Sequence, residues 1–356
     1  MPTLEVQFKS GARTTLVIEP GAIARLPRLC ADAGLTGTSA LLCDAKLLQL
    51  HRAQLLAIDP QPIARPISEE WKSLAEVEAM CETFANRGLA RDAFIIAVGG
   101  GVLTDLAGLA AAIYLRGVPW VSVPTTLLAQ VDAGLGGKTG ANLRAGKNLV
   151  GAFHQPRLVL CDPALLATLP PRERWTGLGE VVKCALLGGG ALLEQCEANL
   201  EEAAAGDAAA LAPLIEGAVR LKARLVAEDE RERTTSGRAM LNFGHTVGHA
   251  LEAATKYVHF THGEAVALGL KGAIELSESL PAGERERALK LVRRLQIAAS
   301  LALPAEQREQ ALLAMTRDKK VRKGVVRFVV LDRIGAPALR EVTADECRRA
   351  LAASLA

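Results

Sequence analysis

Residues 93–105 read Ala-Phe-Ile-Ile-Ala-Val-Gly-Gly-Gly-Val-Leu-Thr-Asp, and this stretch decides the fold. Its opening run of six apolar residues is too short for a helix and is typical of a buried strand in a parallel sheet. After the three glycines, residues 102–115 show a nearly all-apolar helical pattern, which indicates a deeply buried helix. A strand, a glycine turn and a helix in this order predict an open α/β sheet.

The glycine turn is also a candidate anion site. Glycines allow the backbone to approach a pyrophosphate closely, and the start of a helix offers free N–H groups to an anion. The pattern is not Gly-x-Gly-x-x-Gly, however, and a tight strand-to-helix turn is a competing explanation. Asp105, in the first turn of the helix, could favour the helix dipole or meet a ribose or nicotinamide group.

Strand and helix signals alternate on both sides of this stretch. Buried strands are predicted at 39–43 and 118–123, and an amphipathic helix is predicted at 74–89. The same alternation extends over residues 1–170, which we therefore interpret as an α/β domain.

The character of the sequence changes at Pro170-Pro171. The residues that follow are rich in Ala, Leu, Glu and Arg at helical spacing, with few strand signals. One late strand is predicted at 325–331 and a last helix at 344–355. Residues 171–356 therefore predict a second, predominantly helical domain.

Composition excludes several classes of protein. The chain has 356 residues, 50% of them hydrophobic but only 3% aromatic, which indicates a large aliphatic core and no stacking platform for single-stranded nucleic acid. The net charge of +3 comes from scattered Lys and Arg, without a basic tract that would bind nucleic acid. Seven cysteines without a Cys-x-x-Cys pair are typical of reduced thiols, and no membrane helix or signal peptide is evident. We therefore expect a cytoplasmic protein.

A second glycine-rich stretch, residues 131–148, carries Lys138, Lys147 and Asn148. It resembles a P-loop, but Asp132 stands where that motif requires glycine. Lysines and an amide on a glycine-rich backbone still suit phosphate binding. The alternative interpretation is a mobile surface loop with solvated lysines.

Four of the six histidines fall within 18 positions, at 245, 249, 259 and 262. His245 and His249 are spaced i and i+4, so they share a helix face and could converge on one ion. His262 and a carboxylate at Glu180 strengthen the case for a metal site. The competing interpretations are structural histidines and, for Glu180 with Lys183, an ordinary surface ion pair. The charged run 229–233 is interpreted as a solvated turn.

Taken together, these motifs resemble those of the 3-dehydroquinate synthase family of sugar phosphate cyclases, over about Asp44 to Gly335. Each motif is weak alone, but the ordered set is highly specific. The set comprises Glu69-Glu-Trp-Lys72, Gly99-Gly-Gly-Val-Leu-Thr-Asp105, Tyr114-Leu-Arg116-Gly, Val123-Pro-Thr-Thr-Leu-Leu-Ala-Gln-Val-Asp132, Gly136-Gly-Lys138-Thr, Gly146-Lys-Asn148, Gly179-Glu180-Val-Val-Lys183, Asn242-Phe-Gly-His245-Thr-Val-Gly-His249, His262-Gly-Glu264 and Asp318-Lys319-Lys320.

The resemblance implies an N-terminal NAD-binding α/β domain, a helical C-terminal domain, an active site between them and a homodimer. The implied reaction converts 3-deoxy-D-arabino-heptulosonate 7-phosphate into 3-dehydroquinate and phosphate. Its steps are transient oxidation by NAD, phosphate elimination, reduction, ring opening and intramolecular aldol closure. A divalent metal, zinc or cobalt, is implied at Glu180, His245 and His262, which leaves His249 on the substrate side. This choice rests on the family, because spacing alone favours His245 with His249.

The resemblance also assigns residue roles. The implied catalytic residues are Lys138, Glu180, Lys183, Arg238, Asn242 and His249. The implied substrate-binding residues are Arg116 (contributed by the partner subunit), Asp132, Lys138, Asn148, Lys183, Lys222, Arg238, Asn242, His249, Lys319 and Lys320. The implied NAD-binding residues are Asp44, Glu69, Lys72, Gly99, Gly100, Gly101, Val102, Asp105, Thr125, Thr126, Asp132, Lys138, Lys147 and Thr168.

Three departures from the family pattern are Lys46 in place of Asn, Ser68 in place of Gly, and a longer loop at 229–237, and none removes a group that the reaction requires. One alternative is a sister cyclase acting on sedoheptulose 7-phosphate or glucose 6-phosphate. Those substrates lack the carboxylate that Lys222 and Arg238 would bind. A second alternative is a metal-dependent polyol dehydrogenase of related fold. A third is a non-enzymatic NAD-binding module, but such a module would not need three aligned metal ligands.

Overall fold

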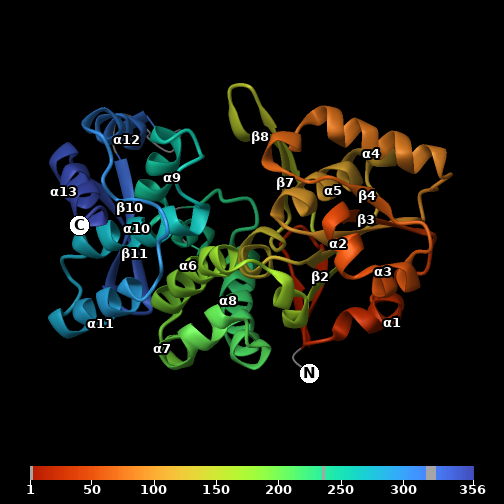
Figure 1. Cartoon of the computed structure of the whole chain (residues 1–356), viewed down its shortest axis with the longest axis horizontal. Coiled ribbons are helices and arrows are strands. Elements are labelled where there is room, and N and C mark those ends of the chain that lie inside the picture. Colours follow the sequence, from red (N-terminus) through yellow and green to blue (C-terminus); the bar gives the residue numbers. More distant parts are fainter. Residues whose placement is uncertain (1–2, 235–236, 318–325) are drawn as a thin grey trace. The chain divides into compact units, whose positions relative to one another are not determined.

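The computed structural model describes residues 3–234, 237–317 and 326–356. The chain divides into two compact units, Met1–Leu169 and Pro170–Ala356 (Figure 1). The division falls one residue before the boundary expected from the sequence. Each unit has its own hydrophobic core, so each is described separately.

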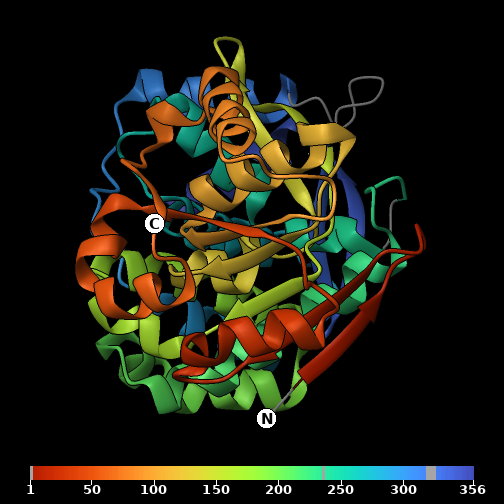
Figure 2. The same cartoon turned by 90° about the vertical axis from the view of Figure 1, so that its right-hand side faces the viewer.

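The N-terminal unit is built on a seven-stranded sheet with the order β1-β2-β9-β6-β5-β3-β4. These strands are β1 (Thr3–Gln7), β2 (Arg13–Ile18), β3 (Ser39–Asp44), β4 (Ile63–Arg65), β5 (Phe94–Gly99), β6 (Trp120–Pro124) and β9 (Leu158–Cys161). Neighbouring strands are parallel except for the β1–β2 pair, drawn in red in Figure 2. The strand order reverses between β3 and β5, and the carboxyl ends beside such a reversal form the usual ligand site of an open α/β sheet.

Helices cover both faces of this sheet because successive strand residues point to opposite faces and both faces are apolar. In β5, Ile95 and Ala97 pack with α4 (Leu74–Asn86) and α5 (Gly101–Ile113). The alternate residues of β5 pack on the other face, with α1 (Leu26–Asp32) and α3 (Arg52–Ile58). The short helix α2 (Ala45–Leu50) follows β3 directly. The predicted strands and helices of this region are therefore confirmed, with small differences at their ends.

The second glycine-rich stretch was interpreted, as one alternative, as a mobile surface loop. The structure shows regular elements there instead. The stretch contains a π-helical turn, η4 (Ala129–Ala133), and a hairpin of β7 (Lys138–Leu143) and β8 (Gly146–Phe153). Glycines of the hairpin allow close strand pairing: a Cβ on Gly140 would lie 2.8 Å from the carbonyl oxygen of Val150, and a Cβ on Gly151 would lie 2.0 Å from that of Thr139. Glycine-rich composition hid the strand signal, because such residues have low strand propensity.

The C-terminal unit is predominantly helical. Its helices are α6 (Pro171–Gly188), α7 (Gly190–Ala205), α8 (Ala208–Glu228), α9 (His245–Ala254), α10 (His262–Glu275), α11 (Ala282–Arg293), α12 (Ala305–Arg317) and α13 (Ala344–Ser354). Its core joins α9, α10, α12 and α13 to strand β10 (Val326–Arg333). Across the described ranges of both units, we find no helix with the length and apolarity to cross a membrane.

The late strand predicted at 325–331 is confirmed as β10, but the sequence missed a second strand, β11 (Ala336–Val342), which pairs antiparallel with β10. Pro337 and Arg340 interrupt the apolar pattern of β11 and concealed it in the sequence. Proline is tolerated here because a strand with one partner leaves half of its N–H groups outside the ladder.

Candidate functional site

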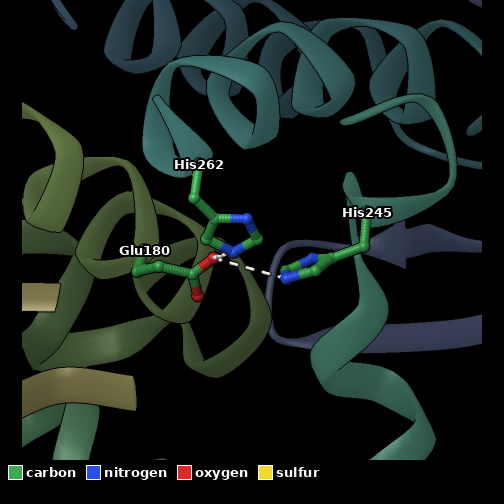
Figure 3. A group of neighbouring side chains, drawn as sticks. All are labelled: Glu180, His245 and His262. Carbon is green, nitrogen blue, oxygen red and sulfur yellow. Dashed lines mark ion pairs between the residues drawn. The ribbon is translucent and has the colours of Figure 1, made fainter. Parts of the chain in front are cut away.

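Three side chains from separate helices of the C-terminal unit point toward one another (Figure 3). Glu180 lies within α6, while His245 and His262 are the first residues of α9 and α10. Glu180 Oε1 is 3.4 Å from His245 Nε2 and 3.5 Å from His262 Nε2. One carboxylate and two imidazoles at these distances could hold a metal ion and leave a coordination position open.

Backbone contact between α6 and α10 sets two of these ligands. A Cβ on Gly263 would lie 1.9 Å from the carbonyl oxygen of Thr176, and a Cβ on Gly179 would lie 2.6 Å from the carbonyl oxygen of Gly263. Glycine at both positions therefore lets the helices touch. Because Gly179 precedes Glu180 and Gly263 follows His262, this contact brings the two ligand side chains together.

A second glycine contact places His245. Gly244, immediately before it, has φ of +79°, and a Cβ on Gly269 of α10 would lie 1.9 Å from the Gly244 carbonyl oxygen. The start of α10 is fixed by a capping box, in which Thr261 and Glu264 exchange hydrogen bonds around His262. Each candidate ligand therefore stands beside a glycine contact or a helix cap.

Glu180 is the most deeply buried member of the cluster, whereas the His262 side chain is 27% exposed. The side chains of Glu180 and Lys183 are each 1% exposed and form an ion pair one helical turn apart. The interpretation of this pair as an ordinary surface ion pair is therefore wrong. Helical spacing identified their shared face, but it does not say whether that face is buried.

The pKa values of the two histidines shift in opposite directions, although burial alone lowers both. Burial lowers the pKa of His245 well below the usual value, and the charge of Lys183 acts in the same direction. Burial also disfavours the charged form of His262, but hydrogen bonds to Glu180 and Glu252 outweigh it and raise the pKa to about 10. His245 is thus already neutral and ready to coordinate a cation, whereas an ion at His262 must displace a proton.

His249, the i+4 partner of His245, lies beside the cluster. Its ring centroid is 5.1 Å from that of His245 and 5.9 Å from that of His262. Together with Glu252 and His262 it forms a second group that could hold an ion. His259 lies apart, with Nε2 2.8 Å from the carbonyl oxygen of Ser300.

The 3-10 turn η6 (Gly237–Asn242) carries two further predicted residues just before His245. Arg238 is buried and donates from Nη1 to the Glu230 carbonyl oxygen at 2.7 Å. Asn242 donates from Nδ2 to Glu232 Oε1 at 3.1 Å. Glu232, whose φ is +51°, was not marked by any motif, and the only available signal was its place in the charged run before Arg238.

The charged run 229–233 is a turn, as predicted, but only part of it is solvated: Arg231 and Arg233 are exposed, whereas its first two residues are buried. Asp229 and Glu230 are each 8% exposed, and the Asp229 carboxylate accepts hydrogen bonds from the backbone N–H groups of Arg233 and Thr234. The charge is thus used to fold the loop on itself. Lys222 is likewise buried, on α8. Lys319 and Lys320 lie outside the described residues.

In the N-terminal unit, Lys72 is the centre of a polar cluster. Its Nζ donates to Asp105 Oδ2 and to Asn148 Oδ1, both at 2.5 Å. Glu69, three residues earlier, lies 3.4 Å from Lys147 Nζ and accepts a hydrogen bond from Asn142. These contacts join the segment around η2 (Glu69–Trp71) to the β7–β8 hairpin, so five residues with predicted roles lie close together.

Most of the remaining predicted residues of this unit follow the carboxyl ends of its parallel strands, whereas Arg116 precedes the amino end of β6. Gly99 ends β5 and Gly101 begins α5, so the glycine turn stands beside the reversal of strand order. Asp44 ends β3 and caps α2. The others are Gly100 and Val102 in the turn and first turn of α5, Thr125 and Thr126 after β6, Asp132 in η4, Lys138 at the start of β7, Thr168 in η5 (Pro163–Thr168) and Arg116 in η3 (Tyr114–Arg116).

The burial of Asp105 in this cluster can be tested through the pH dependence of the stability of the chain. Burial raises its pKa from 3.8 to about 6, although Lys72 opposes the shift. The folded chain therefore binds this proton more tightly than the unfolded chain, so the contribution of Asp105 to the free energy of unfolding falls as pH rises between these values.

We expect the melting temperature of the wild type, minus that of Asp105→Asn, to fall across this pH range and then to level off. The variant cannot titrate at position 105, so the difference isolates this group from other acidic residues. Asp92→Asn, at an exposed position, serves as the control. A difference that stays constant over the range would contradict the prediction.

Solved structures similar to this chain define the class of protein. A 2-deoxy-scyllo-inosose synthase complexed with carbaglucose-6-phosphate, NAD⁺ and Co²⁺ shares the fold, with a TM-score of 0.86, 24% identity and coverage of 98% of this chain and 99% of that chain. ValA, a 2-epi-5-epi-valiolone synthase from Streptomyces hygroscopicus subsp. jinggangensis with NAD⁺ and Zn²⁺ bound, has a TM-score of 0.80 and 28% identity, covering 99% and 98%. The chain therefore has the fold of these two synthases, which are enzymes.

Family models narrow the class further. The model of the 3-dehydroquinate synthase N-terminal domain matches residues 63–176, and that of the C-terminal domain matches residues 177–321. A 3-dehydroquinate synthase of Citrifermentans bemidjiense is 41% identical over 340 residues, which cover 92% of each chain. The chain belongs to the 3-dehydroquinate synthase family.

Proposed function

We propose that this chain converts 3-deoxy-D-arabino-heptulosonate 7-phosphate into 3-dehydroquinate and phosphate, with NAD oxidised and regenerated in each turnover. The observation that carries the proposal is the convergence of Glu180, His245 and His262 in a chain of this family. Such a site suits a reaction in which oxygen atoms of a sugar must be polarised.

The donor set supports a divalent metal, zinc or cobalt, at these three residues. Carboxylate oxygen and imidazole nitrogen are ligands that both ions accept, and three protein ligands leave room for substrate. When bound, the ion would supply Lewis-acid polarisation of the substrate hydroxyl and carbonyl oxygens. The burial of Glu180 keeps bulk water from competing with that polarisation.

Charged residues of the C-terminal unit would orient the substrate. Lys222 and Arg238 are buried cations suited to its carboxylate, and a planar guanidinium can bind a carboxylate through two hydrogen bonds. Asn242 and Lys183 would bind ring hydroxyls through hydrogen bonds, and His249 would exchange protons with the substrate. For the phosphate group we propose Lys138, Asn148, Lys319, Lys320 and Arg116 of the partner subunit.

The N-terminal unit would hold NAD at the glycine turn. Gly100, the N-cap of α5, makes no side-chain cap hydrogen bond, and the N–H groups of the first turn of such a helix can bind a pyrophosphate. Asp44, Glu69, Lys72 and Asp105 would hold the ribose and nicotinamide ends. The other residues of the proposed NAD site are Gly99, Gly100, Gly101, Val102, Thr125, Thr126, Asp132, Lys138, Lys147 and Thr168.

A homodimer in the cytoplasm completes the proposal. Ile113 is 53% exposed and Leu115 is 39% exposed, and they precede Arg116 by three residues and one residue. Exposed apolar side chains beside a cation with a proposed role in the partner subunit support contact with a second copy at this place. Sedimentation of the purified chain would measure its oligomeric state.

One assay tests the reaction against its alternatives. The purified chain, with zinc or cobalt and substoichiometric NAD, is given the heptulosonate phosphate, sedoheptulose 7-phosphate, glucose 6-phosphate or a polyol. We expect phosphate release from the heptulosonate alone, without net NADH. Phosphate release from another sugar would indicate a sister cyclase, and accumulation of NADH with a polyol would indicate a dehydrogenase. No turnover with any of them would leave a binding module.

A further inference from the structure

Glu252 is a buried carboxylate that stands outside every role assigned so far. It lies on α9, seven residues after His245, and is 8% exposed. Both carboxylate oxygens are 3.4 Å from Nδ1 of His262. Nε2 of the same ring is 3.5 Å from Glu180 Oε1. The His262 imidazole therefore lies between two carboxylates, one at each nitrogen.

The two ring nitrogens of a neutral imidazole are not equivalent, because one carries a proton and the other a lone pair. A carboxylate at Nδ1 keeps the proton on that atom, which leaves the lone pair on Nε2. The same hydrogen bond fixes the plane of the ring and increases the basicity of the coordinating nitrogen. At His262, the lone pair would then point toward Glu180 and His245.

We propose that Glu252 is a positioning residue, which holds His262 in the tautomer and orientation needed to bind a metal through Nε2. The proposal rests on the metal site of the proposed function, at Glu180, His245 and His262. Glu252 itself binds neither the ion nor the substrate. It acts only through the His262 ring.

A different arrangement must be distinguished from this one. His249, Glu252 and His262 form a group whose ligand atoms lie within 4.8 Å of one another. An ion held there would use Nδ1 of His262, so it would compete with the first arrangement for a single lone pair. Burial favours the arrangement at Glu180, His245 and His262, because the side chain of Glu180 is 1% exposed whereas His249 is exposed. Buried charge demands a cationic partner more strongly than exposed charge.

The test compares zinc affinity in full-length Glu252→Gln, Glu252→Ala and His249→Ala, by competition with a chromophoric chelator at fixed pH. Glu275→Gln, at an exposed position on α10, is the matched control. We expect Glu252→Ala to weaken zinc binding by about 10- to 100-fold, the usual effect of losing such a partner. Glu252→Gln should lose less, because its amide oxygen can still accept the Nδ1 proton, and His249→Ala should bind nearly as well as the wild type.

Wild-type affinity in Glu252→Ala would overturn the proposal. Equal, severe losses of zinc affinity in Glu252→Gln, Glu252→Ala and His249→Ala would also overturn the proposal. Such losses would indicate that Glu252 and His249 bind the ion directly. The absorption bands of the cobalt-loaded chain report geometry as well: the wild type and Glu252→Gln should share one spectrum. If Glu252→Ala fails to fold, the Gln variant and His249→Ala still decide the matter. These measurements need no turnover, so failure of the proposed reaction in the assay above would be a separate result.

Discussion

Glu180→Gln should yield a folded chain that binds no metal and has lost activity by about a thousandfold or more, because a metal ion that polarises substrate oxygens supplies several kcal/mol. Glutamine has nearly the shape of glutamate but no negative charge, and Glu180 Oε1 is the atom that faces both histidines. Metal content after gel filtration and phosphate release from the heptulosonate would be measured on the same preparation.

Glu173→Gln provides the matched control, because Glu173 lies on the same helix at an exposed position, two turns before Glu180. It should retain metal and activity. His245→Ala removes a ligand from a different helix and should reproduce the double loss. Full metal occupancy in either Glu180→Gln or His245→Ala would refute the assignment of that residue as a ligand.

The fold of the N-terminal unit could be predicted from β5 and its turn. Six apolar residues before three glycines fit only a short buried strand, and the structure places alternate residues of that strand in two separate cores. β11 could not be predicted in the same way, because its strand pairing depends on β10 and not on an apolar pattern of its own. Tertiary pairing of this kind overrides local propensity.

The site shows a similar limit. Helical spacing predicted that His245 and His249 bind one metal ion together. Only the resemblance to a family indicated that the ligands are Glu180, His245 and His262, without His249. The physical basis of that ligand set is backbone contact between helices that are far apart in sequence, such as Gly263 against Thr176. Such a contact produces no periodic pattern in the sequence, because a glycine within a helical pattern indicates only low helix propensity. Glu252 escaped notice for the same reason.

Gly263→Ala tests this account of the site, and its expected effect is large. The new Cβ would meet the Thr176 carbonyl oxygen at 1.9 Å and its carbonyl carbon at 2.5 Å, and both atoms belong to backbone that cannot rotate away. Helices α6 and α10 must therefore separate. We expect a loss of about 1–3 kcal/mol or more in the free energy of unfolding, the typical cost of overpacking. Because His262 precedes Gly263, the separation also moves a ligand away from Glu180, and zinc affinity should fall sharply.

Gly272→Ala separates the two effects, because Gly272 lies on the same helix but packs against Ala350 of α13, where a Cβ would meet the carbonyl oxygen at 2.6 Å. This variant should lose stability and keep zinc affinity, whereas Gly283→Ala, with nothing within 4 Å, should lose neither. Denaturant unfolding of the metal-free chains and zinc competition would measure both quantities. If Gly263→Ala lost no more zinc affinity than Gly272→Ala, close contact of α6 with α10 would not be what places His262. A selective loss in Gly263→Ala is expected instead, because the ligand and the glycine are adjacent in the first turn of α10.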